Sequence, residues 1–192
     1  MKKGNYSNMI LFFEGVDKSG KSTLIKNYKE KLGQWAAVYK NSFVKPSDAG
    51  LSFKDAITGF YAGLYEGFLF RANTEISLVD RSHITEIVYA PIKRGYDADI
   101  PRWRQIEKIF ATLEEAAIVY VDTSNLTLAQ RHEIEPDDYI KIEEIVRIKQ
   151  GYEDYFASNT LLPVIRINGD ATREEMLDEL SQKIDEHFGK KD

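Results

Sequence analysis

Short, nearly unbroken apolar runs recur along the chain and alternate with longer stretches in which apolar residues recur every three or four positions. The short runs predict strands covered on both faces, because a strand exposed on one face would alternate apolar and polar side chains. The five predicted strands are Met9–Glu14, Ala36–Lys40, Ile76–Asp80, Ala117–Asp122 and Pro163–Ile167.

The longer stretches have the period of amphipathic helices that bury one face. The predicted helices are Ser22–Leu32, Leu51–Phe70, Trp103–Leu113, Tyr139–Phe156 and a last helix that begins after Thr172. Thr-Arg-Glu-Glu at residues 172–175 is typical of a capping box at the start of that last helix. Strands that alternate with helices predict an α/β fold, here a three-layer α/β/α sandwich around a five-stranded parallel sheet. No repeat or linker-like tract interrupts the pattern, so we expect residues 1–192 to form a single domain.

Composition narrows the possible functions. The 192 residues include 26 basic and 31 acidic ones, a net charge of −5, whereas proteins dedicated to duplex DNA usually carry a strongly basic surface. The chain has no cysteine, which excludes disulfides, cysteine-ligated zinc and thiol nucleophiles. No apolar run is long enough for a signal peptide core or a membrane span. We therefore expect a cytoplasmic protein that does not bind a membrane, and the charge balance argues against a dedicated binder of duplex DNA.

A phosphate-binding motif follows the first predicted strand and precedes a predicted helix. Residues 15–23 read Gly-Val-Asp-Lys-Ser-Gly-Lys-Ser-Thr and fit the P-loop pattern G-x-x-x-x-G-K-S/T. Its two glycines allow backbone N–H groups to converge on an anion, and the helix start adds partial positive charge. Lys21 can reach the β- and γ-phosphates of a nucleotide, and Ser22 is placed to ligate Mg²⁺. The predicted ATP site comprises Gly15, Val16, Asp17, Lys18, Ser19, Gly20, Lys21, Ser22 and Thr23.

Polar residues also follow the third predicted strand, at the sheet edge where parallel α/β folds bind ligands. Asp80 closes an apolar run and suits a water-mediated contact to the Mg²⁺ that Ser22 would ligate. Arg81 can bind a phosphate with two parallel hydrogen bonds. Phosphoryl transfer needs mainly positioning and charge neutralisation, so a lysine, an arginine and a metal ion suffice. The alternative interpretation of Asp80 and Arg81 is a surface pair at a strand end.

Residues 13–23 and the later Asp80-Arg81-Ser82 resemble the thymidylate kinase family of P-loop nucleoside monophosphate kinases. The resemblance implies ATP- and Mg²⁺-dependent phosphorylation of a deoxynucleoside monophosphate, most directly dTMP to dTDP, by a homodimer. One subgroup of the family has a basic residue in the loop, matching Lys18, and no catalytic arginine in the lid. The corresponding lid here, about residues 131–138, is acidic after its first residues. The resemblance therefore implies Lys18, Lys21 and Arg81 as catalytic residues.

The same resemblance implies which residues surround the two nucleotides. The position of Asp17 contacts the acceptor sugar's 3′-hydroxyl, Arg81 binds the acceptor phosphate, and Tyr89 packs beside the base or sugar. Arg131 resembles the arginine near the adenine at the start of the lid. The loop on the other side of the adenine corresponds to Asn168, Gly169 and Asp170. The implied acceptor site comprises Asp17, Lys45, Phe60, Arg71, Arg81 and Tyr89.

Two departures from the family pattern concern the acceptor. The family has Phe-Pro-x-Arg after the second strand, whereas this chain has Phe-Val-Lys-Pro at residues 43–46, so either Lys45 replaces the arginine or the acceptor is held differently. Arg71 lies only nine residues before Asp80, closer than the family's arginine. Both differences bear on base recognition, so the preferred base stays open.

Other functions remain as alternatives. Asp80-Arg81-Ser82 is also similar to the Glu-Arg-Ser of deoxynucleoside kinases, whose 5′-hydroxyl acceptor needs a carboxylate base, and Glu14 is the obvious candidate for it. A kinase of a modified base in DNA would need a basic groove, and a nucleotide-gated binding module would hold ATP without an acceptor. His83 either lines the acceptor site or lies on the surface at a helix start. Asp137 and Asp138 are expected to cap the following helix.

Overall fold

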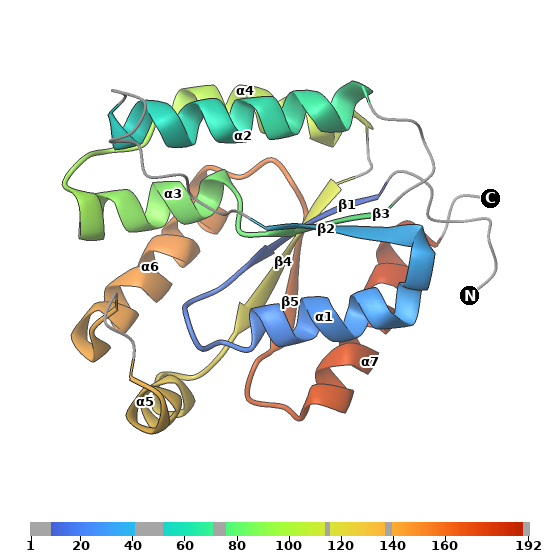
Figure 1. The fold of residues 1–192 in the computed structure, drawn as a ribbon, viewed down its shortest axis with the longest axis vertical. Coiled ribbons are helices and arrows are strands. Elements are labelled where there is room, and N and C mark those ends of the chain that lie inside the picture. Colours follow the sequence, from blue (N-terminus) through green and yellow to red (C-terminus); the bar gives the residue numbers. More distant parts are fainter. Residues whose placement is uncertain (1–8, 41–51, 71–75, 114–115, 137–139, 190–192) are drawn as a thin grey trace.

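The computed structural model describes residues 9–40, 52–70, 76–113, 116–136 and 140–189. Within these ranges one parallel sheet has the strand order β2-β3-β1-β4-β5 (Figure 1). Each strand prediction is confirmed to within one residue at either end, and so is the α/β fold class. The strands are β1 (Ile10–Glu14), β2 (Ala36–Lys40), β3 (Ile76–Asp80), β4 (Ala116–Asp122) and β5 (Val164–Asn168).

The predicted helices are confirmed with small differences at their ends. The capping box of the last helix is present, because the Thr172 hydroxyl accepts from the Glu175 N–H and the Glu175 carboxylate accepts from the Thr172 N–H. No helix of the described segments is long and apolar enough to cross a membrane. The five helices are α1 (Lys21–Leu32), α2 (Phe53–Phe70), α4 (Ile100–Leu113), α6 (Ile142–Ser158) and α7 (Arg173–Phe188).

Sequence patterns did not predict four helical segments. The side chains of α3 (His83–Tyr89) are all buried, so the segment has no polar face that would reveal a helical period. Helix α5 (Asn125–Ile134) includes the first residues of the expected lid, and the capping role predicted for Asp137 and Asp138 lies outside the described residues. The other two are the short 3-10 helix η1 (Gly33–Trp35) and the π-helical segment η3 (Ala90–Arg94).

Both faces of the sheet are covered by helices, which makes the three expected layers (Figure 1). Ile10 and Phe12 of β1 belong to a core cluster shared with α2, α3, α4 and α6. Leu11 and Phe13, the alternate residues, belong to a second cluster shared with α1 and α7. Successive side chains of a strand point to opposite faces, so an unbroken apolar run is what a doubly covered strand requires.

A buried polar network joins the helices on one side of the sheet. His83, at the start of α3, is only 1% exposed, so its interpretation as a surface residue is wrong. Its ring contacts the Tyr65 hydroxyl at 2.7 Å and the Glu107 carboxylate at 3.0 Å. Glu107 also accepts hydrogen bonds from the Tyr155 hydroxyl at 2.9 Å and the Leu161 N–H at 2.7 Å. The network thus fastens α3 to α2, α4 and α6.

Acid should weaken the fold through Glu107. Burial alone would raise the pKa of Glu107, but the hydrogen bond and charge of His83 and the donors Leu161 and Tyr155 together lower it below its ordinary value of 4.5. A carboxyl whose pKa is lowered by folding adds stability above its unfolded pKa and loses it as the pH falls through the folded pKa. We expect urea denaturation to show the free energy of unfolding falling as the pH drops below about 4.5.

The variant Glu107→Gln removes this titration, and we expect it to be less stable at neutral pH by about 2 kcal/mol. Its acid decline should be shallower than that of the wild type. The matched variant Glu143→Gln changes an exposed glutamate of α6 and should leave both quantities unchanged. Parallel acid profiles for Glu107→Gln and the wild type would contradict the role assigned to Glu107.

Candidate nucleotide-binding site

The P-loop connects β1 to α1 and has the backbone that its glycines permit. Gly15 has φ +149° and Gly20 has φ +95°, both in the region that favours glycine. A Cβ atom added at Gly15 would lie 2.8 Å from the Ser19 hydroxyl oxygen, too close for any other residue without rearrangement. Helix α1 begins directly after Gly20, so its free N–H groups face the same side as the loop. The strand–loop–helix context required of the motif is therefore present.

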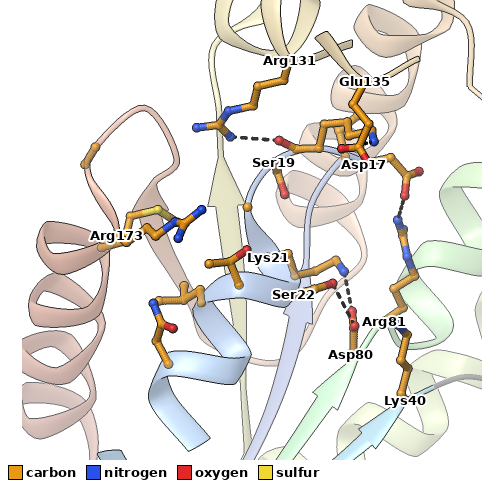
Figure 2. A pocket seen from close by; sticks show the side chains of 18 of the residues that line it. Asp17, Ser19, Lys21, Ser22, Lys40, Asp80, Arg81, Arg131, Glu135 and Arg173 are labelled. Carbon is orange, nitrogen blue, oxygen red and sulfur yellow. Dashed lines mark hydrogen bonds and ion pairs between the residues drawn. The ribbon is translucent and has the colours of Figure 1, made fainter. Parts of the chain in front are cut away.

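A pocket of about 760 Å³ opens over this loop (Figure 2). The predicted site residues that line it are 16–23, Asp80, Arg81 and Arg131. The pocket also has lining residues that we did not assign to the site from the sequence, including Asn27, Lys40, Glu135, Arg173 and Met176. Lys40 is the last residue of β2 and Arg173 is the first residue of α7. Their positions at the ligand-binding edge of a parallel sheet were the sequence feature that could have assigned them to the site.

Lys21, Ser22 and Asp80 meet at the floor of the pocket (Figure 2). The Lys21 ammonium donates to one carboxylate oxygen of Asp80, and the Ser22 hydroxyl donates to the other at 3.1 Å. Lys21 and Asp80 are each only 5% exposed. Burial alone would raise the pKa of Asp80, but the Lys21 charge and hydrogen bond, with Arg81 and Ser22, lower it. Asp80 is thus a carboxylate at neutral pH, beside a hydroxyl.

This donor set fits Mg²⁺. The ion prefers oxygen ligands and usually takes one or two from the protein while it keeps water and phosphate oxygens. Ser22 and Asp80 supply such a pair next to the P-loop. In the described segments, no group of three or more His, Cys, Asp or Glu residues could hold a metal by itself. The residues therefore suit an ion brought in with a nucleotide.

Arg81 lies at the pocket in a constrained conformation. Its φ of +72° is in the left-handed region, which costs a non-glycine residue about 1–3 kcal/mol and occurs where neighbouring contacts enforce it. Its guanidinium donates to Asp17, and Tyr89 donates to the other Asp17 oxygen at 3.0 Å. The guanidinium also lies 5.3 Å from the centre of the Tyr89 ring. Three of the six residues that the resemblance assigned to the acceptor are thus in contact.

Within the described segments, one nitrogen of Arg81 has no hydrogen-bond partner. The Nη1 atom is buried, and nothing in the described part of the chain accepts from it. Buried donors are nearly always paired, so an unpaired guanidinium N–H beside a pocket indicates a place for an anionic oxygen.

Arg131 joins the P-loop to the loop between β5 and α7. Its guanidinium donates to the Lys18 carbonyl at 2.9 Å and to the Gly169 carbonyl at 3.0 Å. A Cβ atom added at Gly169 would lie 1.9 Å from the hydroxyl oxygen of Thr123, the residue after β4, so a larger residue would not fit there without rearrangement. The structure therefore brings Arg131 and Gly169 into direct contact.

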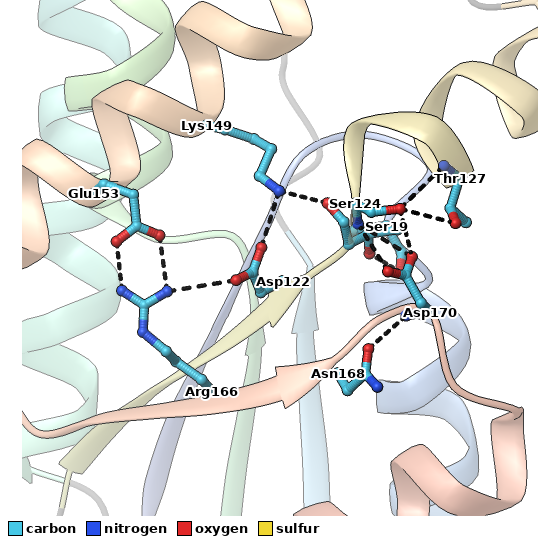
Figure 3. Close-up of polar contacts among 10 residues, drawn as sticks. Ser19, Asp122, Ser124, Thr127, Lys149, Glu153, Arg166, Asn168 and Asp170 are labelled. Carbon is cyan, nitrogen blue, oxygen red and sulfur yellow. Dashed lines mark hydrogen bonds and ion pairs between the residues drawn. The ribbon is translucent and has the colours of Figure 1, made fainter.

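Asn168 and Asp170 support that loop from within (Figure 3). The Asn168 side-chain oxygen accepts from the Asp170 N–H at 3.0 Å, and the Asp170 carboxylate accepts from the Ser124 N–H at 3.1 Å. Near it, the Lys149 ammonium donates to the Thr123 carbonyl at 2.6 Å and fastens α6 to the end of β4. Asn168 and Asp170 thus shape the edge of the site, while Arg131 lines the pocket.

The predicted lid and the basic loop residue also meet. Lys18 has φ +67°, and its ammonium lies 2.8 Å from the carboxylate of Glu135, the C-cap residue that follows α5. Glu135 is the more exposed partner, with 78% of its side chain accessible against 22% for Lys18. An acidic lid residue therefore faces the lysine for which the resemblance implied a catalytic role.

Among the described residues implied for the acceptor, Phe60 and the buried Tyr89 do not line this pocket. Phe60 lies on α2 with 38% of its surface exposed, and its ring contacts Tyr61. Lys45 and Arg71 lie outside the described residues.

No family model and no curated protein sequence matches this chain, but solved structures of similar fold do. A YorR protein from Bacillus subtilis, in complex with phosphorylated GDP, aligns over 93% of this chain and 98% of its own, with a TM-score of 0.70 and 19% identity. The chain has the P-loop kinase fold. Deoxyadenosine kinase from M. mycoides, with the products dCMP and a flexible dCDP bound, aligns over 93% of this chain and 100% of its own. Its TM-score is 0.59 at 14% identity.

Proposed function

We propose that this protein is an ATP- and Mg²⁺-dependent kinase of deoxynucleoside monophosphates, with dTMP as the first acceptor to test. The observation that carries the proposal is Arg81, which lines the P-loop pocket and whose buried Nη1 has no acceptor among the described residues. A monophosphate offers this guanidinium an anion, whereas a nucleoside does not. Asp17 and Tyr89 keep the guanidinium in place for it. The P-loop kinase fold supports the same class of reaction.

In this mechanism an oxygen of the acceptor phosphate attacks the γ-phosphorus of ATP, and the bond from that phosphorus to the β–γ bridging oxygen breaks to release ADP. The attacking oxygen is already ionised at neutral pH, so no general base is needed. Lys18, Lys21 and Arg81 neutralise charge on the transferring group. When bound, Mg²⁺ would supply further neutralisation of the phosphate oxygens, held by Ser22 and Asp80.

A deoxynucleoside kinase is the second candidate, because deoxyadenosine kinase is among the similar structures. Such an enzyme needs a carboxylate base near a 5′-hydroxyl. Glu14, the candidate from the sequence, is fully buried and does not line the pocket. Both its oxygens already accept hydrogen bonds from other protein groups. These contacts favour the monophosphate as acceptor.

A panel of deoxynucleoside monophosphates and the matching nucleosides, assayed with ATP and Mg²⁺ by ADP release, tests the proposal. We expect a monophosphate to be preferred over its nucleoside in kcat/KM by about a hundredfold or more, since the nucleoside leaves Arg81 unpaired. Preference for a nucleoside would establish the second candidate instead. ATP binding without ADP release for any acceptor would indicate a binding module. The homodimer and the cytoplasmic location stay predictions.

A further inference from the structure

Glu14, the last residue of β1, places a carboxylate in the interior directly before the P-loop. The side chain is fully buried. One oxygen accepts from the Ser82 N–H at 2.7 Å and from the Ser82 hydroxyl at 2.6 Å. The other accepts from the hydroxyls of Thr85 at 2.6 Å and Tyr152 at 3.0 Å. Four donors from α3, α6 and the turn before α3 thus converge on one side chain.

The turn that Glu14 holds is the one that carries Arg81. Ser82 follows Arg81 directly, and the Arg81 N–H donates to the Phe13 carbonyl at 3.1 Å. The peptide units on both sides of Arg81 are therefore fastened to the end of β1. A non-glycine residue keeps a left-handed backbone only when neighbouring contacts enforce it. The hydrogen bonds to Phe13 and Glu14 are such contacts for Arg81.

The same short segment also fixes the other end of Arg81. Asp17, three residues after Glu14, accepts from the guanidinium. The backbone and the guanidinium of Arg81 are therefore both held by contacts to residues 13–17, the end of β1 and the start of the P-loop. These contacts set the position of Arg81 relative to the P-loop.

We propose that Glu14 is a positioning residue, which holds the Ser82 turn so that Arg81 presents its unpaired Nη1 to the acceptor phosphate. The effect of this role on phosphoryl transfer rests on the proposed kinase function, but the effect of Glu14 on the position of Arg81 does not. It also differs from the general-base role that a nucleoside acceptor would give Glu14. A positioning role needs only an oxygen that accepts from Ser82, whereas a base must gain a proton.

Two variants of Glu14 separate these roles. Glu14→Gln keeps an amide oxygen that can accept from Ser82, and Glu14→Met has similar bulk without any acceptor. Thr85→Val is the matched control, because it removes a hydroxyl from the other oxygen of the same carboxylate with little change of shape. Three readouts apply to each variant: acceptor KM and kcat, ATP affinity by calorimetry, and the Nε–Hε NMR signal of Arg81 in nucleotide-free protein. Loss of that signal in Arg81→Lys assigns it.

We expect Glu14→Met to raise the acceptor KM and lower kcat by about tenfold each, because a misplaced group loses its reaction geometry. Its Arg81 signal should shift, while its ATP affinity stays within about threefold of wild type. Glu14→Gln should stay within about threefold in every readout, and Thr85→Val should lower the melting temperature without moving the Arg81 signal. Should Glu14→Met fail to fold, Ser82→Ala replaces it, with changes of the same kind and smaller size.

Other outcomes overturn the proposal. An unchanged Arg81 signal and unchanged acceptor kinetics in Glu14→Met, or in Ser82→Ala in its place, would show that the carboxylate only stabilises the core. Equal loss of kcat in Glu14→Gln and Glu14→Met would indicate a general base. If the wild type transfers phosphate to no acceptor, the proposed function fails, while the Arg81 signal in the variants still decides whether Glu14 positions that arginine.

Discussion

Replacing Lys21 by alanine is expected to lower kcat by about a hundredfold or more, with a smaller effect on the acceptor KM. Lys21 is the first residue of α1 and lines the pocket. Its ammonium donates to Asp80, which also accepts a hydrogen bond from Ser22. It is therefore placed to balance charge on a transferring phosphoryl group. Steady-state kinetics with saturating ATP measures the effect.

The control for this variant is Lys26→Ala, which removes the same charge from an exposed position of the same helix and should leave kcat unchanged. Lys21→Ala also leaves the buried Asp80 without its ammonium, so we expect a lower melting temperature, and the assay must be run below it. A folded Lys21→Ala protein with near-normal kcat would remove Lys21 from the mechanism.

Replacing Arg81 by alanine is expected to reduce kcat/KM for the acceptor by about a hundredfold or more. The loss should be much larger for the acceptor than for ATP binding, because the unpaired Nη1 is the atom assigned to the acceptor phosphate. Parallel measurement of acceptor kinetics and ATP affinity tests this asymmetry.

Arg81→Lys is the matched variant, since it keeps the charge and loses the planar two-pronged donor geometry. We expect it to recover part of the activity lost in Arg81→Ala. An equal loss of ATP affinity and acceptor turnover in Arg81→Ala would show that the guanidinium acts on the donor nucleotide. Near-normal turnover would exclude Arg81 from the reaction.

Features that depend on local sequence were predicted well. The strands are unbroken apolar runs because helices cover both sheet faces, and the P-loop is a contiguous motif whose glycines have a direct conformational reason. Asp17, Arg81 and Tyr89 were grouped through a family resemblance, and the structure places them in contact.

Features that depend on how elements meet were not predicted. Helix α3 is buried all round, so it lacks the polar face on which helix prediction depends. His83 was taken for a surface or site residue because nothing in the local sequence shows that Glu107, 24 positions away, lies against it. Arg173 and Met176 reach the pocket only because β5 lies beside β4 and brings the start of α7 to the P-loop.

The ion pairs of the pocket also explain how a chain of net charge −5 can gather cations in one cavity. Lys18 faces Glu135, Lys21 faces Asp80, and Arg81 faces Asp17, so the protein supplies each of these three cations with its own counter-ion. Mutual repulsion among the cations is thereby offset in the resting protein. A nucleotide would bind by exchange, because its phosphates replace the carboxylates as partners of the cations. Its affinity then reflects the difference between the phosphate and the carboxylate interactions, instead of the full attraction of three unpaired cations.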